Sequence, residues 1–221
     1  MNKKMSGVLF AIAALVLTSL GCSLSSILPG SGSVLEDDFS SGDSWGTSTD
    51  SSSSIEYADG GLQMKIFTQN YFIWSTPNTE SYENVHIEVT VKNNDTDATT
   101  AFGILCNQQT VNDSFYYMVM TPAGEYAIAK AALAQTDVFL TNNDQWATSD
   151  AIAQNSPSYR VGADCGNGAL TLYVDGQQIA TVSDASYTAG TVGLLTWSGE
   201  QASTADVTFD DFVVTKLQSQ Q

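Results

Sequence analysis

Apolar and polar residues alternate along much of this chain, and this pattern constrains its fold more than any other feature. Over residues 85–92, valine or isoleucine occupies every second position and a polar residue occupies each position between. A period of two places the apolar side chains on one face of a β-strand and leaves the other face in water. Similar alternation occurs in 170–174 and in parts of 205–215, and no long stretch has the 3.6-residue period of a helix. The sequence therefore predicts an all-β protein.

Turn sequences divide the chain into short segments. Asp175-Gly176 separates two apolar segments, and an Asp-Gly pair tolerates the positive φ values of a type I′ turn. Pro122-Ala123-Gly124 separates 115–121 from 125–131 in a similar way. Residues 127–134 are rich in alanine and could form a short helix, but we expect a strand followed by a loop because a hairpin turn precedes them. About a dozen short strands with frequent turns favour a β-sandwich of two antiparallel sheets.

The last predicted strand, 205–215, changes face in its middle. Val207 and Phe209 share one parity, whereas Phe212 and Val214 share the other. A bulge at Asp210-Asp211 would keep all four apolar side chains in the core.

The N-terminal segment reads as an export signal. Lys3 and Lys4 precede a largely apolar run of 15 residues, from 7 to 21, and a membrane-spanning helix needs about 20. The run ends in Thr18-Ser19-Leu20-Gly21-Cys22, which resembles the bacterial lipoprotein signal except that Ser19 stands where leucine is usual. We expect 1–21 to be a lipoprotein signal peptide and Cys22 to carry the lipid. An uncleaved anchor and an ordinary cleaved signal are the alternatives.

The remaining chain divides into three parts. Residues 22–33 are rich in serine and glycine and are expected to form a flexible tether. Residues 34–217 have a uniform composition and the length of one β domain. The polar residues 218–221 are expected to be a disordered tail. This organisation predicts an extracytoplasmic protein at the cell membrane or cell surface, held by lipid alone.

Acidic residues dominate the charge. The chain has 24 Asp and Glu against seven Lys and Arg, a net charge of −17. Removal of the signal peptide would take away Lys3 and Lys4, so that five basic residues remain against 24 acidic ones, a net charge of −19. Binding to nucleic acid depends on basic contacts to phosphate, so we expect no nucleic-acid partner.

The chain has three cysteines. If Cys22 carries lipid, Cys106 and Cys165 remain as a pair in an oxidising compartment, where disulfides persist. Each of the two follows an apolar, strand-like run. We expect a disulfide that joins neighbouring strands, with two buried free thiols as the alternative.

Several segments of the chain share a pattern: Asp37-Asp38-Phe39 followed by Trp45, 57–62, 102–104, 115–117 with 124–126 after it, 159–161, 168–176, 189–194 and 209–214. Taken together, they resemble the concanavalin A-like lectin/glucanase jelly roll. Within that superfamily the likeness is greatest to laminin-G-like domains and to domains grouped as 3-keto-disaccharide hydrolases. The resemblance covers nearly all of 34–217 and implies a jelly-roll sandwich. It implies little about function, because the superfamily contains lectins, adhesion modules, glycosidases and spacer domains.

A catalytic site is not apparent. Jelly-roll glucanases carry the motif Glu-x-Asp-x-x-Glu on one strand, and this chain lacks it. The nearest candidates are Glu83 and Glu88, whose spacing of five would put them on opposite faces of a strand. The single histidine, His86, is expected on the wet face of its strand without a catalytic partner. We therefore assign no catalytic residue and favour a protein that is not an enzyme.

Candidate residues for binding a sugar are aromatic residues with amides or carboxylates close to them. Sugars stack their C–H faces on rings, and their hydroxyls need directed hydrogen bonds. For each aromatic residue, packing in the core is the competing interpretation, and we expect Trp45 to be in the core. The candidates are Trp74, Tyr116, Tyr126, Trp146 and Trp197, with Gln108, Asn112 and Asp113.

The resemblance also implies a structural calcium site. In related jelly rolls the first and last strands lie side by side, which would bring Asp37 and Asp38 close to Asp210 and Asp211. Calcium prefers carboxylate and carbonyl oxygens. The alternative is that these carboxylates cap nearby backbone groups.

These observations together favour a lipid-anchored, extracytoplasmic, non-catalytic binding or adhesion module for carbohydrate. One alternative is a domain that binds another envelope protein or has a structural role. The other is a glycoside hydrolase or lyase of the 3-keto-disaccharide type. The partners expected are a glycan or an envelope protein, and the oligomeric state is left open.

Overall fold

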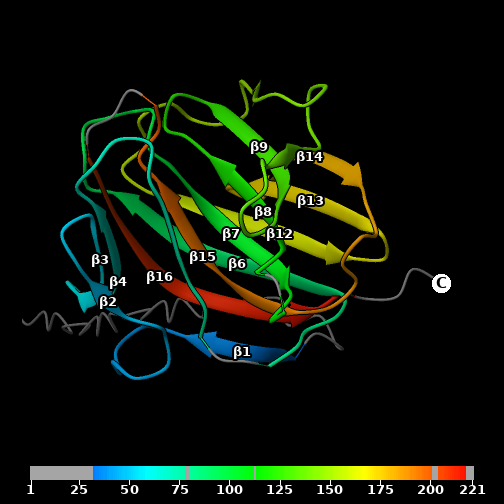
Figure 1. Cartoon of the computed structure of the whole chain (residues 1–221), viewed down its shortest axis with the longest axis horizontal. Helices are drawn as coiled ribbons and strands as arrows, with labels where there is room; N and C mark the ends of the chain where they lie inside the picture. Colours follow the sequence, from blue (N-terminus) through cyan, green and yellow to red (C-terminus); the bar gives the residue numbers. More distant parts are fainter. Residues whose placement is uncertain (1–31, 78–79, 112, 201–203, 218–221) are drawn as a thin grey trace, which may run out of the picture.

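The computed structural model describes residues 32–77, 80–111, 113–200 and 204–217. Within these residues every regular element is a β-strand, and the strands form two antiparallel sheets that pack face to face (Figure 1). The expected signal peptide, Cys22, nearly all of the tether, Asn112 and the tail lie outside the described residues. None of the described elements is a helix with the length and apolar character needed to cross a membrane.

The larger sheet has nine strands. β1 (Ser33–Asp37) pairs with β16 at the side of the main path of the sheet. The main path is, in order, β14 (Gln177–Ser183), β13 (Ala169–Val174), β12 (Tyr159–Gly166), β6 (Val85–Asn93), β16 (Ala205–Lys216), β4 (Gly61–Ile66), β3 (Ser53–Ala58) and β2 (Ser48–Thr49).

The smaller sheet has seven strands. β11 (Ala147–Thr148) pairs with β9 beside the main path. The main path is, in order, β10 (Val138–Phe139), β9 (Glu125–Ala131), β8 (Phe115–Met120), β7 (Ala101–Gln108), β15 (Thr191–Trp197) and β5 (Phe72–Ser75).

The main core lies between the two sheets, on the faces that the alternation predicts. Val85, Ile87, Val89 and Val91 of β6 are at most 1% exposed and all belong to this core. Trp45 is buried there as well, and the centroid of its ring lies 4.9 Å from that of Phe212. The predicted all-β sandwich and the core position of Trp45 are therefore confirmed.

The bulge predicted in β16 is present. The pairing of β16 with β6 shifts register between Asp210 and Val213, and Asp211 has a φ of 49°. One extra residue moves the following side chains to the other face of a strand. As a result Phe209 and Phe212 are both fully buried in the same core.

The predicted hairpins are also confirmed. Residues 125–131 form strand β9 and the following residues form a loop, so the alanine-rich segment is not a helix. Asp175 and Gly176 have φ values of 50° and 76° and connect β13 to β14. Positive φ at both positions is what a type I′ turn requires.

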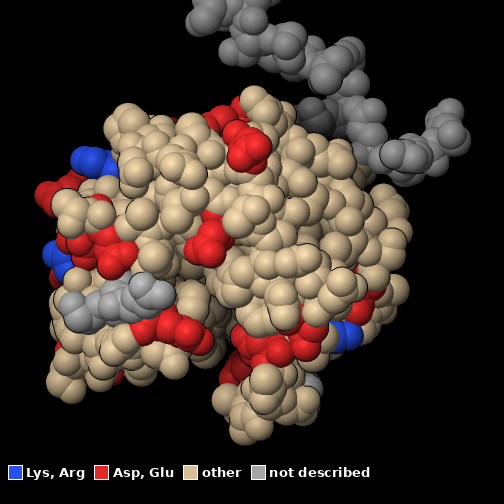
Figure 2. All heavy atoms as spheres, turned by 90° about the horizontal axis from the view of Figure 1, so that it is seen from above, with Lys and Arg blue, Asp and Glu red and all other residues tan. Residues whose placement is uncertain are grey.

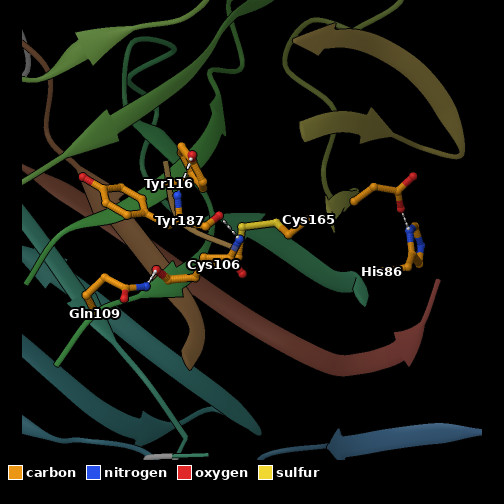
Figure 3. The surroundings of a disulfide bond; sticks show 8 residues. His86, Cys106, Gln109, Tyr116, Cys165 and Tyr187 are labelled. Atoms are coloured by element: carbon orange, nitrogen blue, oxygen red, sulfur yellow. Dashed lines mark hydrogen bonds and ion pairs between the residues drawn. A yellow bond between two sulfur atoms is a disulfide. The ribbon is translucent and has the colours of Figure 1, made fainter. Parts of the chain in front are cut away.

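The disulfide between Cys106 and Cys165 is present, but it does not join neighbouring strands of one sheet. Cys106 is on β7 of the seven-stranded sheet and Cys165 is on β12 of the nine-stranded sheet, so the bond crosses the core (Figure 3). The Cα atoms are 6.5 Å apart, less than the about 10 Å usual between packed sheets, so the sheets approach closely here. The sequence placed each cysteine at the end of a strand-like run but did not show which sheet each strand would join.

Candidate functional site

The seven-stranded sheet is apolar on both of its faces. Its outer face carries a second cluster of buried apolar side chains, which includes Leu105, Tyr117, Val119 and Leu195. The outer face of an antiparallel sheet is usually polar and wet. An apolar outer face is the kind of surface that a ligand or a partner covers.

A pocket of about 420 Å³ lies on this outer face, and we call it the aromatic groove. Its floor comes from the central strands β7, β8 and β15, which contribute small or aliphatic side chains such as Ala101 and Leu195. Most of its walls are aromatic. The aromatic residues that line it are Phe72, Trp74, Phe115, Tyr117, Phe139, Trp146 and Trp197.

One group of rings joins the edge strand β5 to β8. Phe72 and Phe115 are stacked, with centroids 6.2 Å apart, and Trp74 is 5.8 Å from Phe115. The strands β15 and β7 lie between β5 and β8, so these rings reach across them. Two of the outward-facing positions of β7, Ala101 and Gly103, hold almost no side-chain volume, whereas the next such position carries Leu105.

A second group of rings comes from residues that are far apart in the sequence. Trp146 lies just before β11, Trp197 ends β15, and their rings are stacked with centroids 5.8 Å apart and an interplanar angle of 18°. Phe139 of β10 lies 6.0 Å from Trp146. The indole N–H of Trp197 donates to Oδ1 of Asn70 at 3.2 Å, which helps to hold the ring. The groove is thus bordered by preformed aromatic faces.

Two carboxylates, Asp113 and Asp137, are among the residues that line the groove. The hydroxyl of Tyr117 donates to Oδ2 of Asp137 at 2.9 Å. Burial raises the pKa of Asp137, and the hydrogen bond from Tyr117 offsets part of this rise. Burial and the charge of Asp137 raise the pKa of the Tyr117 hydroxyl. Asp137 is therefore a partly desolvated carboxylate with one hydrogen bond from within the groove.

The structure brings four of the predicted binding residues together. Trp74, Trp146, Trp197 and Asp113 all line the aromatic groove. They come from β5, from the segments before β11 and β8, and from β15, so nothing in their sequence spacing indicates that they meet. The side chain of Trp74 remains partly open to solvent, with 36% of its surface exposed.

Three other predicted binding residues lie elsewhere. Tyr116 is fully buried in the main core, its ring is 4.9 Å from that of Tyr187, and its hydroxyl donates to Asp184. Tyr126 also packs against the main core. Gln108 accepts a hydrogen bond from Thr191 at 2.9 Å and does not line the groove. Tyr116 faces the core because the outward-facing parity of β8 belongs to Tyr117.

Sequence reasoning missed several residues of the groove. Phe72, Phe115 and Phe139 line it but were not chosen as candidates. A signal for part of the groove was present, because all six residues of β8 are apolar or aromatic. A strand that is apolar at both parities is buried on both faces, so residues at the second parity needed a partner outside the main core.

The expected calcium ligands do not form a cation site. β1 pairs with β16 as the resemblance implied, with Asp37 opposite Phe212. However, Asp37 accepts hydrogen bonds from the backbone of Phe39 and from the indole of Trp45, and Asp210 accepts one from the backbone of Asp211. Asp38 likewise accepts from the backbone of Ser40. In the part of the chain that is described, no three acidic, histidine or cysteine side chains are grouped so as to hold a metal ion.

The outer face of the nine-stranded sheet carries a polar network around His86. Nδ1 of His86 lies 2.6 Å from Asp164, Nε2 lies 3.4 Å from Glu88, and the hydroxyl of Tyr173 donates to Asp164 at 2.8 Å. Arg160 contacts the same Glu88 at 3.3 Å. His86 therefore has an acidic partner that its sequence position did not reveal, because β6 pairs with β12 and places Asp164 opposite it.

The contacts in this network stabilise the ionised forms of His86 and Glu88. Burial lowers the pKa of His86, but the hydrogen bonds to Asp164 and Glu88 outweigh it and raise the pKa from 6.5 to about 9. The hydrogen bond from His86 and the charge of Arg160 lower the pKa of Glu88 to about 2, against the effect of burial. Glu83 precedes β6 and is not part of the network. A histidine and a glutamate with these pKa values stay charged at neutral pH, as in a structural ion-pair network.

Solved structures with the same architecture include carbohydrate-active proteins. The carbohydrate-binding module CBM66 from Bacillus subtilis superposes with a TM-score of 0.58 and 12% identity, over 77% of this chain and 94% of the module. The catalytic domain of a laminarinase, an endo-1,3-β-glucanase, from Thermotoga petrophila gives 0.56 and 10%, over 86% and 99%. The κ-carrageenase from Pseudoalteromonas carrageenovora gives 0.58 and 10%, over 88% and 99%.

These similarities define the fold. The chain has the concanavalin A-like jelly-roll fold that its motifs predicted. No protein-family model matches the sequence, and no curated protein matches it. At identities of 10% to 12% the similarity does not extend to function, which must be argued from the groove itself.

Proposed function

We propose that this protein is a non-catalytic carbohydrate-binding module whose ligand occupies the aromatic groove. The observation that carries the proposal is the set of seven aromatic side chains around a pocket of about 420 Å³ on the outer face of a sheet. A volume of this order suits a small ligand or a short piece of a longer one.

The rings suit a sugar because of their chemistry and their support. A pyranose ring presents C–H groups that pack on an aromatic face, and aromatic contacts contribute about 0.5–1.5 kcal/mol beyond the area they bury. Trp146 and Trp197 stack on each other, and Trp197 is further held by Asn70. Side chains that are already ordered lose little conformational entropy when a ligand binds.

The apolar floor of the groove and the absence of the Glu-x-Asp-x-x-Glu motif from the sequence favour binding without hydrolysis. Glycosidases generally place two carboxyl groups about 5–10 Å apart on either side of the scissile bond. In the described part of the lining, Asp113 and Asp137 are the only carboxylates, and Asp137 accepts a hydrogen bond from Tyr117. The floor strands contribute Ala101, Leu195 and other apolar side chains instead of acids.

The neighbouring structures give this proposal support from the fold. They include a carbohydrate-binding module, glucanases and a carrageenase complexed with an oligosaccharide. They include both binding modules and enzymes, so they do not choose between the two. That choice rests on the lining of the groove described above.

We further propose that the domain acts outside the cytoplasm and is anchored by lipid at Cys22. The sequence of 1–22 supports this, and so does the disulfide between Cys106 and Cys165, because disulfides persist mainly in oxidising compartments. Mass spectrometry of the N-terminal peptide tests the anchor. Diacylglyceryl on Cys22 is the expected result, and an intact residue 21–22 bond would contradict it.

A glycan array, followed by calorimetry on the glycans that bind, tests the binding function. Trp197→Ala removes one of the stacked rings and should weaken binding by about tenfold or more, equivalent to about 1.4 kcal/mol. The matched control is Phe67→Ala, which truncates an exposed ring that does not line the groove and should leave binding unchanged. An array without any binding, or equal losses in both variants, would refute the proposal.

The same glycans test whether the module is an enzyme. Each glycan that binds is incubated with the protein, and its products are separated by chromatography. We expect no cleavage. Cleavage that disappears in Asp137→Asn would show that the groove is catalytic and would overturn the non-catalytic assignment.

A further inference from the structure

We propose that the aromatic groove is selective for glycans with free amino groups, such as polymers that contain unacetylated glucosamine, and discriminates against glycans with acidic groups. This inference rests on the proposed carbohydrate function and adds the chemical class of the sugar. It follows from where the charges of the molecule lie relative to the groove.

Positive charge is absent from the groove in the described residues. None of the residues that line it is lysine or arginine. Of the five basic residues that the structure describes, Lys65, Lys92, Arg160 and Lys216 belong to strands of the nine-stranded sheet. A sulfated or uronic glycan would therefore meet no opposite charge in the groove.

The fifth described basic residue, Lys130, is on the seven-stranded sheet but is not available to the groove. It alternates along β9 with Ala129 and Ala131, and only Ala131 of these three lines the groove. Nζ of Lys130 lies 2.9 Å from Oδ2 of Asp184, so its charge is neutralised by an ion pair.

Negative charge is present in the groove, and the chain as a whole is acidic. Asp113 and Asp137 line the groove, and the whole chain has a net charge of −17. Figure 2 shows acidic side chains distributed over the face seen from above, with basic side chains only toward its edges. Clefts with one sign of charge and apolar walls concentrate ligands of the opposite sign.

The position of Asp137 makes it a suitable partner for an ammonium group. The hydroxyl of Tyr117 supplies it with one hydrogen bond, at Oδ2. An ionised carboxylate accepts about four hydrogen bonds, so it can also accept from an ammonium group. Because burial disfavours the charged form of Asp137, a bound cation would relieve a cost that already exists.

The aromatic walls favour the same ligand. An ammonium group within about 6 Å of the face of a tryptophan, tyrosine or phenylalanine ring is attracted by about 0.5–2 kcal/mol. The groove has seven such rings, and Asp113 lies just before one of them, Phe115, in the chain. An N-acetyl group on the sugar would remove the positive charge and with it both attractions.

Calorimetry on two matched oligosaccharide series tests the inference. The ligands are β-1,4-linked glucosamine oligomers and N-acetylglucosamine oligomers of the same length, at about pH 6, where amino groups are protonated. The protein is the mature chain with Cys22→Ser. We expect the amino form to bind about tenfold more tightly or better, and this preference to fall as salt rises from about 0.05 M to about 0.5 M.

Charge-neutral variants locate the effect. Asp113→Asn and Asp137→Asn together should remove the preference for the amino form, and an asparagine at 137 can still accept the hydrogen bond from Tyr117. The matched control is Asp59→Asn, which removes one charge at a hairpin turn of the nine-stranded sheet and should keep the preference. Circular dichroism and thermal melting confirm that all variants fold.

The outcomes separate this inference from the proposed function. If acetylated or acidic glycans bind as tightly as the amino form, or if the preference survives in the double variant, the inference is wrong and carbohydrate binding stands. If neither series binds but other glycans on the array do, the inference is again wrong and the proposed function stands. If no glycan binds, both are wrong.

Discussion

Reduction of the Cys106–Cys165 disulfide should cost this protein a large part of its stability. The bond joins residues separated by 59 positions and links one sheet to the other across the core. Without it, the unfolded chain gains the freedom of an open loop of that length. The chain-entropy relation for a loop of about 60 residues gives about 4 kcal/mol at room temperature. For a domain of this size, the same loss lowers Tm by about 8–16 °C.

Urea unfolding of the mature chain with Cys22→Ser, followed by tryptophan fluorescence, measures this loss. The comparison is between oxidised and reduced protein, because reduction keeps both sulfur atoms in the core and changes only the cross-link. The double variant Cys106→Ala, Cys165→Ala should lose about 4 kcal/mol or slightly more, since it also leaves small cavities. Added reductant should not change the unfolding of this variant, which serves as the control.

The result that would refute the reasoning is a small effect on reduction. A loss below about 1 kcal/mol would mean that the unfolded state is already restricted near these cysteines, so that the bond removes little entropy. A large loss in the alanine variant without a matching loss on reduction would assign the effect to packing instead of the cross-link.

Two further perturbations test other parts of the structure. Because the pKa of His86 is raised from 6.5 to about 9, its stabilising contribution should be complete below about pH 6.5 and lost as the pH rises through 9. NMR titration of this single histidine should give a midpoint near 9, and a midpoint near 6.5 would contradict the network. The loss of stability at high pH should be on the order of 1 kcal/mol after allowance for partial exposure. This loss should be absent in His86→Gln. Gly103→Ala should destabilise the domain by about 1–3 kcal/mol in urea unfolding, because a Cβ there would lie 2.0 Å from the carbonyl oxygen of Met118. Unchanged stability would mean that β7 and β8 can separate at this point.

Some features followed from the sequence because they depend on local rules. Alternation placed Val85 and its neighbours in the core, the Asp-Gly pair produced a tight turn, and the change of parity at Asp210-Asp211 produced a bulge. Each of these depends on residues that lie a few positions apart. The cysteine pair was also predictable, since the expected export signal implied an oxidising compartment, where disulfides persist.

The sequence did not show which side chains of β8 face the core and which face outward, because every residue of this strand is apolar or aromatic. Tyr116 and Tyr117 are neighbours in a strand that is apolar at both parities. The pattern requires that one faces the core and the other faces outward, but it does not say which. The pairing of β8 with β7 and β9 fixes the orientation of the strand, and the side chain of Tyr117 then lines the groove.

The sequence by itself determined that this protein is an all-β jelly-roll sandwich with a disulfide, because hydrophobic period, turn chemistry and cysteine number act over short distances. Only the tertiary structure decided that Phe72 meets Phe115, that Trp146 stacks on Trp197, and that His86 faces Asp164. Each of these pairs depends on which strands become neighbours and which side chains reach across them. Strand order is a property of the whole sheet, so the candidate site could be recognised only once the sheets were assembled.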